Sequence, residues 1–319
     1  MANAGPPELG AIIDVTGRHG DERLDAPAVL RHDVRAHLLE DAGRMYRLLG
    51  LTGPLQRRLD RMRSEPLAPE GTKPEREYLI LFTARSGSSH LTQLLASAGV
   101  GDPREWLNPR FLAGQAEFLG ARSFEDYFAA MRARFSPNGV FGHEMTMGFH
   151  QDFSREVRLE DHFDFGAPTI FLYREDIVQQ AVSLTFASHR NVFHNTGGLG
   201  PGDLGPVPYS VRKIRHSLLL LAGQERQSLA FLDRHAAPVR YLSYEALVRN
   251  DPRRVVRAIS DHVGAKPDLA ALSSDHRKLG DQTNLEHAER FARDQGRLLA
   301  SVFRRRRRLL QRAMQSPLI

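Results

Sequence analysis

Residues 78–98 read YLILFTARSGSSHLTQLLASA, and this segment decides the fold. Its first five residues form a short apolar run of the kind that a buried parallel strand needs. A turn of small residues follows, and Leu91, Leu94 and Leu95 then share one face of a helix. The order strand, turn, helix predicts an α/β domain whose P-loop-like sheet of mostly parallel strands is flanked by helices.

The turn after this strand, Arg85-Ser86-Gly87-Ser88-Ser89, has the composition of an anion cradle. Backbone N–H groups at a helix N-terminus point at an anion, and the macrodipole adds about half a positive charge there. Glycine permits a tight turn, the serines supply hydroxyl donors, and arginine adds a forked cation. The G-x-x-x-x-G-K-[ST] spacing of a Walker loop is absent. An ordinary βα turn and the modified phosphate loop of a small-molecule kinase remain as alternatives.

Composition limits the classes of protein that the chain can belong to. Its 319 residues suffice for one large α/β domain with an extension. The absence of cysteine excludes disulfides and thiolate metal sites, and it favours a reducing cytoplasm. No signal-peptide pattern and no apolar run of about 18 residues occur, so we expect a cytoplasmic protein without a membrane span. The net charge of +6 suits a polyanionic ligand and also permits nucleic acid.

The chain divides into two predicted parts. Residues 1–75 begin with glycines and prolines, show a helical period and end in the proline-rich segment 64–75. We therefore predict a helical N-terminal extension and linker at 1–75 and one domain at 76–319. The segment 195–208 contains five glycines and three prolines, which predicts a mobile lid or substrate loop.

Further elements follow from periodicity and turn residues. Strands are expected at 140–145, 169–173 and 239–242; helices are expected at 123–135, 151–161, 177–187, 211–235 and 251–259; and a polar loop is expected at 267–284. A last helix is expected to end in the basic run Arg304–Arg308. This run is typical of a solvated face that the helix dipole favours, with a nucleic-acid or membrane anchor as the alternative.

A second pair of candidate residues lies on the strand at 169–173 and the helix that follows it. Arg174 stands at the carboxyl end of the strand, and Ser183 lies on the helix. Ligands of open parallel sheets bind outside these strand ends, where an arginine can fork onto a phosphate. The histidines at 143, 150 and 162 fit no familiar ligand spacing, so we expect no metal site.

Several pieces together resemble the bacterial carbohydrate sulfotransferases typified by trehalose 2-sulfotransferase. They are YLILFTARSGSSHLTQLLASAGV, PREW, SPNGVFG and FLYREDIVQQAVS, with a weaker echo in RKLGDQTN. They occur in the order and spacing of that family over residues 78–285. The resemblance implies a nucleotide-binding transferase that uses 3′-phosphoadenosine 5′-phosphosulfate as co-substrate, releases adenosine 3′,5′-bisphosphate and forms a homodimer.

The resemblance also implies residue roles. The loop Arg85–Ser89 would hold the 5′-phosphosulfate, with Arg85 stabilising the leaving group, and Arg174 and Ser183 would hold the 3′-phosphate. Glu105, in the PREW piece, falls on the carboxylate proposed as general base. Such a base takes the acceptor hydroxyl's proton and is typically worth about 100- to 10,000-fold in rate. No metal is needed when helix amides, hydroxyls and an arginine stabilise the charge.

The chain also departs from the family pattern. Glu144-Met145-Thr146-Met147 stands where the family often has Lys or Arg followed by a Leu-Met-Trp run, and Thr185-Phe186 replaces Trp-Arg. Glu144 is therefore a rival candidate for the base. Because cations and aromatic residues are lost near the expected acceptor pocket, a less polar acceptor is an alternative to a sugar: a hydroxyl on a lipid, a glycoside or a secondary metabolite. A basic nucleic-acid-binding protein remains a rival that is not an enzyme.

Overall fold

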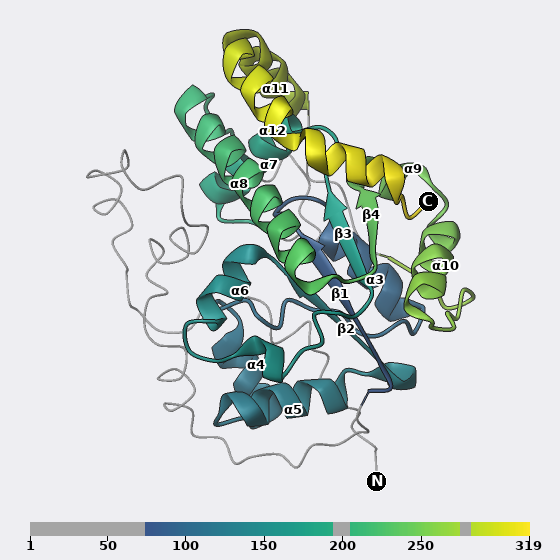
Figure 1. The fold of residues 1–319 in the computed structure, drawn as a ribbon. Helices are drawn as coiled ribbons and strands as arrows, with labels where there is room; N and C mark the ends of the chain where they lie inside the picture. The colour runs from purple at the N-terminus through teal and green to yellow at the C-terminus, as the bar shows by residue number, and fades with distance from the viewer. Residues whose placement is uncertain (1–73, 194–204, 275–281) are drawn as a thin grey trace.

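The computed structural model describes residues 74–193, 205–274 and 282–319 (Figure 1). The N-terminal extension predicted for 1–75 therefore lies almost wholly outside the described residues. The same holds for most of the lid predicted at 195–208; its last residues, 205–208, are described and form neither helix nor strand.

The centre of the fold is a four-stranded parallel sheet with the order β2-β1-β3-β4. Its strands are β1 (Arg76–Phe82), β2 (Val140–Met145), β3 (Thr169–Tyr173) and β4 (Val239–Ser243). β2 and β3 are buried along their whole length, as expected for a parallel sheet covered on both faces. β3 is almost continuously apolar, whereas β2 also buries His143 and Glu144. The predicted α/β fold class is confirmed.

Ten helices of the described residues surround this sheet. They are α3 (Ser88–Ser97), α4 (Leu112–Leu119), α5 (Phe124–Arg134), α6 (Met147–Phe153), α7 (Ile177–Arg190), α8 (Val211–His235), α9 (Tyr244–Arg249), α10 (Pro252–Val263), α11 (Gln282–Asp294) and α12 (Gly296–Gln315). Short 3₁₀ turns lie at Pro137–Gly139 and Leu159–Asp161. In Figure 1, α8 crosses the viewer's side of the sheet, α3 and α10 lie behind and beside it, and α4 and α5 lie below.

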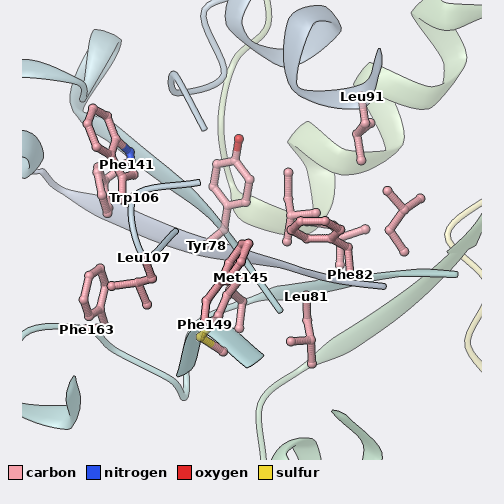
Figure 2. Close-up of a cluster of buried hydrophobic side chains, with 14 of the residues drawn as sticks. Tyr78, Leu81, Phe82, Leu91, Trp106, Leu107, Phe141, Met145, Phe149 and Phe163 are labelled. Atoms are coloured by element: carbon pink, nitrogen blue, oxygen red, sulfur yellow. The ribbon is translucent and has the colours of Figure 1, made fainter. Parts of the chain in front are cut away.

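Two apolar clusters hold these layers together. The larger one joins the sheet to the helices around it, and Figure 2 shows its part around Tyr78, Trp106 and Phe141. The Tyr78 ring fits there because its neighbour on β2 is Gly142, where a Cβ atom would come within 2.4 Å of Tyr78 Cζ. The Tyr78 hydroxyl donates a hydrogen bond of 2.6 Å to the Val100 carbonyl. The second cluster joins α7, α8, α11 and α12.

Several boundary predictions were wrong. α7 and α10 run past their expected ends at 187 and 259, to Arg190 and Val263. The helix expected at 151–161 is wrong over most of its length: α6 covers only Met147–Phe153, and a 3₁₀ turn covers Leu159–Asp161. α6 begins earlier than expected because the Thr146 side chain caps it by accepting from the Phe149 amide at 3.2 Å. The loop expected to run to residue 284 already becomes helical at Gln282. The last helix continues past Arg308 to Gln315, so the basic run lies within the helix rather than at its C-terminus.

The basic run is also not uniformly solvated. The side chains at 304, 305, 307 and 308 are exposed, but Arg306 is only 2% exposed. It forms an ion pair with the buried Glu225 of α8. The prediction of a solvated face is therefore wrong for Arg306.

Candidate active site

The turn between β1 and α3 lies at the carboxyl edge of the sheet and contains two residues with left-handed backbone. Arg85 has φ 66° and Gly87 has φ 91°, so both lie in the left-handed region. Such a succession of conformations points backbone amides into an anion-binding concavity. No side chain of the described residues caps α3, and the N-terminus of a helix favours an anion. The Ser86 hydroxyl is fully buried there and has no hydrogen-bond partner within the described residues.

Gly87 is required by space as well as by backbone conformation. A Cβ atom at this position would lie 2.7 Å from Cδ2 of Tyr244, the first residue of α9. Real Cβ contacts are longer than this, so any other residue would displace the Tyr244 ring. The ring therefore forms a wall of the cradle opposite the turn.

Arg85 connects the cradle to α7. Its Nε donates to Oγ of Ser183 at 3.2 Å, and its Nη1 donates to the Phe193 carbonyl. The α7 residue Gln180 fixes the same turn, because its Nε2 donates to the Ala84 carbonyl at 2.8 Å. The family resemblance implied that Arg85 and Ser183 bind opposite ends of one ligand. In the structure the two side chains are in direct contact through the hydrogen bond between Nε and Oγ.

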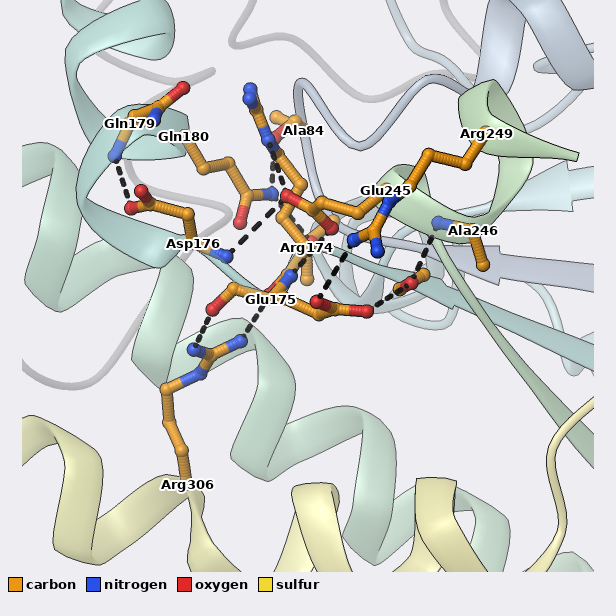
Figure 3. A network of polar contacts seen from close by, with 12 residues as sticks. Ala84, Arg174, Glu175, Asp176, Gln179, Gln180, Glu245, Ala246, Arg249 and Arg306 are labelled. Atoms are coloured by element: carbon orange, nitrogen blue, oxygen red, sulfur yellow. Dashed lines mark hydrogen bonds and ion pairs between the residues drawn. The ribbon is translucent and has the colours of Figure 1, made fainter. Parts of the chain in front are cut away.

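Arg174 directly follows β3 and is 9% exposed. Its guanidinium carbon lies 4.5 Å from the centroid of the Tyr244 ring. Its Nε lies 3.6 Å from Oε1 of Glu245, whose other carboxylate oxygen accepts from the Glu175 amide at 2.9 Å (Figure 3). Tyr244 therefore contacts both halves of the site, since it lies against Gly87 and under Arg174.

The two arginines affect each other electrostatically. Burial lowers the pKa of Arg85 to about 10, and the positive charge of Arg174 contributes to this lowering, while Tyr244 opposes it. Arg85 is still protonated at neutral pH. Two cations held near each other in a partly desolvated site are unfavourable alone, and an anion with charges at two points would relieve the repulsion.

Two carboxyl groups lie at the carboxyl end of β2. Arg104 forms a parallel bridge with His143, and the Glu144 amide donates to the Arg104 carbonyl at 3.0 Å. This pairing places Glu105 beside the end of the strand. Glu105 is half-buried, and its Oε2 accepts a hydrogen bond from Nδ2 of Asn108.

The second carboxyl group, Glu144, is 4% exposed and adjoins the start of α3. Burial raises its pKa well above the ordinary value, and the negative charge of Glu105 raises it further. Hydrogen bonds from the Ser88 and Thr92 hydroxyls act in the opposite direction but are weaker causes. Burial and the Glu105 charge both favour the protonated form of Glu144, whereas a proton acceptor must be ionised.

The histidines singled out by sequence have packing roles. His143 is 1% exposed and packs against Phe163 in a tilted arrangement, with ring centroids 4.7 Å apart. Burial, together with Arg132, lowers the pKa of His143 to about 3, so its ring is neutral.

Over residues 74–193, 205–274 and 282–319, no three His, Cys, Asp or Glu residues form a metal-binding group. No helix in those ranges has the length and apolar character needed to cross a bilayer.

Sequence reasoning missed Tyr244 and Glu245 as parts of the site. The signal was available, because both residues directly follow β4 and parallel strands end at one common edge. It also missed Thr92 and Asn108, the hydrogen-bond partners of the two carboxyl groups. No local pattern distinguishes these two from ordinary polar residues.

Comparison with known proteins agrees with this geometry. Residues 77–294 match the family model for Stf0 sulphotransferases. The chain is also 26% identical over 260 residues to trehalose 2-sulfotransferase of Mycolicibacterium smegmatis, a match that covers 68% of this chain and 94% of that protein. The resemblance seen in the sequence is confirmed, and the chain belongs to the Stf0 sulphotransferase family.

Proposed function

We propose that this chain moves a sulfuryl group from 3′-phosphoadenosine 5′-phosphosulfate to a hydroxyl group of a carbohydrate, a glycolipid or another small molecule. The observation that carries the proposal is the pairing of two anion-binding elements at one sheet edge. One is the N-terminus of α3, which no side chain of the described residues caps, together with Arg85; the other is Arg174 on the Tyr244 ring. A bisphosphorylated adenosine has one anionic group for each element.

In the proposed reaction the acceptor oxygen attacks sulfur while the bond between sulfur and the bridging phosphate oxygen breaks. The electron pair of that bond leaves on the phosphate, giving adenosine 3′,5′-bisphosphate. Arg85, the α3 amides and the hydroxyls of Ser86 and Ser89 would stabilise the leaving group, while the Ser88 hydroxyl donates to Glu144. Positioning and charge stabilisation of this kind account for most of the catalysis in group transfers between oxygens.

We assign the proton transfer to Glu105. The acceptor hydroxyl must lose its proton as it attacks, and an ionised carboxylate within reach can take it. Glu144 is the rival, but burial and the charge of Glu105 favour its protonated form. Arg174 and Ser183 would serve the 3′-phosphate end of the donor, with Ser183 also orienting Arg85.

The class of acceptor is the finer part of the proposal. The M. smegmatis relative is named for action on trehalose, and this chain differs from the pattern of that family at 144–147 and 185–186. Thr185 and Phe186 lie within the packing between α7 and its neighbours, where the Thr185 hydroxyl lies 2.9 Å from Ser217 Oγ. The differences from the family pattern at Thr185 and Phe186 therefore affect helix packing. Glu144 is the difference that lies next to the proposed base.

Nucleotide binding tests the proposal. Calorimetry should give tighter binding of adenosine 3′,5′-bisphosphate than of adenosine 5′-monophosphate or ADP with Mg²⁺. Arg174→Gln should weaken binding of the bisphosphate about 10- to 100-fold, since hydrogen bonds to charged groups contribute about 1.5–3 kcal/mol. Arg240→Gln, which replaces an exposed arginine of β4, is the matched control. Preference for ADP with Mg²⁺ would favour the kinase alternative instead.

Sulfuryl transfer and the proposed homodimer are tested by separate measurements. Isotopically labelled sulfate donor with a panel of hydroxylated compounds should yield labelled product, and its absence with every hydroxyl class would contradict the proposal. The proposed homodimer predicts twice the chain mass in light scattering. The nucleic-acid alternative predicts binding that weakens steeply with salt.

A further inference from the structure

The C-terminal helix α12 contacts the turn that presents Arg174. This helix spans residues 296–315 and lies beyond the segment that matches the family model, which ends at residue 294. Arg306 is the one arginine of the run 304–308 whose side chain is buried. Figure 3 shows it reaching from α12 to the backbone beside Arg174 and Glu175.

The guanidinium of Arg306 uses all three of its nitrogens. Its Nη2 donates to the Arg174 carbonyl, and its Nη1 donates to the Glu175 carbonyl at 2.9 Å. Its Nε and Nη2 also donate to the Glu225 carboxylate of α8, at 2.7 and 2.8 Å. The Glu225 carboxylate thereby fixes the plane of the Arg306 guanidinium, which in turn holds the carbonyl oxygens of Arg174 and Glu175.

The amide side of the same turn is held by α9. Glu245 accepts from the Glu175 amide at 2.9 Å and from the Asp176 amide at 3.5 Å. The Glu175 side chain accepts from the Ser243 hydroxyl at 2.7 Å. Glu245 and Ser243 thus hold the amides and side chain of this turn, while Arg306 holds its carbonyl oxygens.

We propose that Arg306 is a positioning residue for Arg174, so that the C-terminal helix sets the geometry of the 3′-phosphate end of the donor site. The inference deepens the proposed function and depends on it for the identity of the phosphate. A buried ion pair is weak evidence for added stability, because desolvation offsets the attraction. The contacts of Arg306 with two successive carbonyls give it a more specific role, which is the orientation of this turn.

Two variants and one control test the proposal. Arg306→Lys keeps the charge but replaces the planar fork with a single ammonium that cannot reproduce four donor contacts. The double variant Glu225→Leu/Arg306→Met removes both buried charges, a change that proteins often tolerate without loss of folding. Arg305→Lys alters the exposed neighbour in the same helix and is the matched control.

The first readout is the ratio between the dissociation constants of adenosine 5′-monophosphate and adenosine 3′,5′-bisphosphate. In both Arg306 variants this ratio should fall about tenfold or more, because a small misplacement of Arg174 weakens only the 3′-phosphate contacts. Binding of the monophosphate should stay within about twofold, and the control should match the unaltered protein. Equal weakening of both nucleotides, or no change in the ratio, would overturn the proposal.

The second readout needs no nucleotide. Amide hydrogen exchange at Glu175 and Asp176 should be about tenfold faster in Arg306→Lys than in Arg305→Lys, and unchanged exchange would overturn the positioning role. If the unaltered protein binds the two nucleotides equally, the proposed donor is wrong. Faster exchange would then still support the action of Arg306 on the turn.

Discussion

The raised pKa of Glu144 predicts an unusual dependence of stability on pH. The pKa of Glu144 in the folded protein is raised above its ordinary value of 4.5, mainly by burial. Between 4.5 and the raised value, the folded chain keeps a proton that the unfolded chain has released. Stability therefore falls as pH rises through this window, by about 1.4 kcal/mol for each pH unit.

Glu144→Gln should remove this loss. Glutamine has the shape of the protonated acid, can accept from the Ser88 and Thr92 hydroxyls, and does not ionise when the chain unfolds. The variant should gain stability relative to the unaltered protein as pH rises, by about 2.7 kcal/mol over any two pH units inside the window. Ionisation of groups that do not interact with Glu144, Glu77 among them, occurs in both proteins and cancels in the difference; Glu105 interacts with Glu144, so its ionisation belongs to the measured effect.

Urea denaturation at pH steps between 5 and 8 measures the difference in the free energy of unfolding. Glu117→Gln, which changes an exposed carboxylate of α4, is the matched control and should give a difference that is small at every pH. Activity gives an independent reading: Glu105→Gln should lower turnover about 100- to 10,000-fold, and Glu144→Gln less than tenfold. A stability difference that does not grow with pH would mean that Glu144 is ionised in the folded protein, and the assignment of the base to Glu105 would lose its support.

Three further predictions concern other parts of the chain. Gly87→Ala should lower stability by about 2 kcal/mol in urea denaturation and should weaken nucleotide binding. The backbone of residue 87 is left-handed, which alanine disfavours, and the added Cβ atom would displace the Tyr244 ring. Burial raises the pKa of Glu77 to about 7 despite Arg132, so Glu77→Gln should gain up to about 3 kcal/mol relative to the unaltered protein between pH 4.5 and 7, and a flat difference would contradict this. Replacing arginines 304, 305, 307 and 308 together by glutamine should leave nucleotide affinity within about twofold in calorimetry, since these side chains are exposed; a large loss would place the solvated face of α12 in the site.

The turn that forms the first half of the proposed donor site could be predicted because its determinants are local. An apolar run before residue 83 predicts the strand, and Gly87 with its serines predicts the turn, so the backbone amides follow from one continuous segment. Arg174 could be predicted for a related reason, since it ends the next apolar run. In a parallel sheet, all such strand ends share one edge.

Arg306 could not be predicted because its role depends on distant partners. Five successive arginines look alike in sequence, and only the packing of α12 on α8 turns one of them toward Glu225. The start of α6 was missed for a smaller reason. Thr146 is capable of capping a helix, but it also follows a strand directly, and sequence alone did not separate the end of one element from the start of the next.

The acceptor end of the site leads to a prediction about charge. The family pattern often has a cation at the position of Glu144, and here a buried acid hydrogen-bonded to Ser88 and Thr92 stands beside the proposed base. An acceptor with its own acidic group would find no cation at this position to offset its charge, whereas a neutral hydroxyl compound needs none. We therefore expect transfer to neutral glycosides or lipid alcohols to exceed transfer to uronic acid or phosphorylated analogues of the same skeleton. Competition between matched neutral and anionic acceptors for labelled sulfate measures this preference, and preference for the anionic member would mean that another cation serves the acceptor.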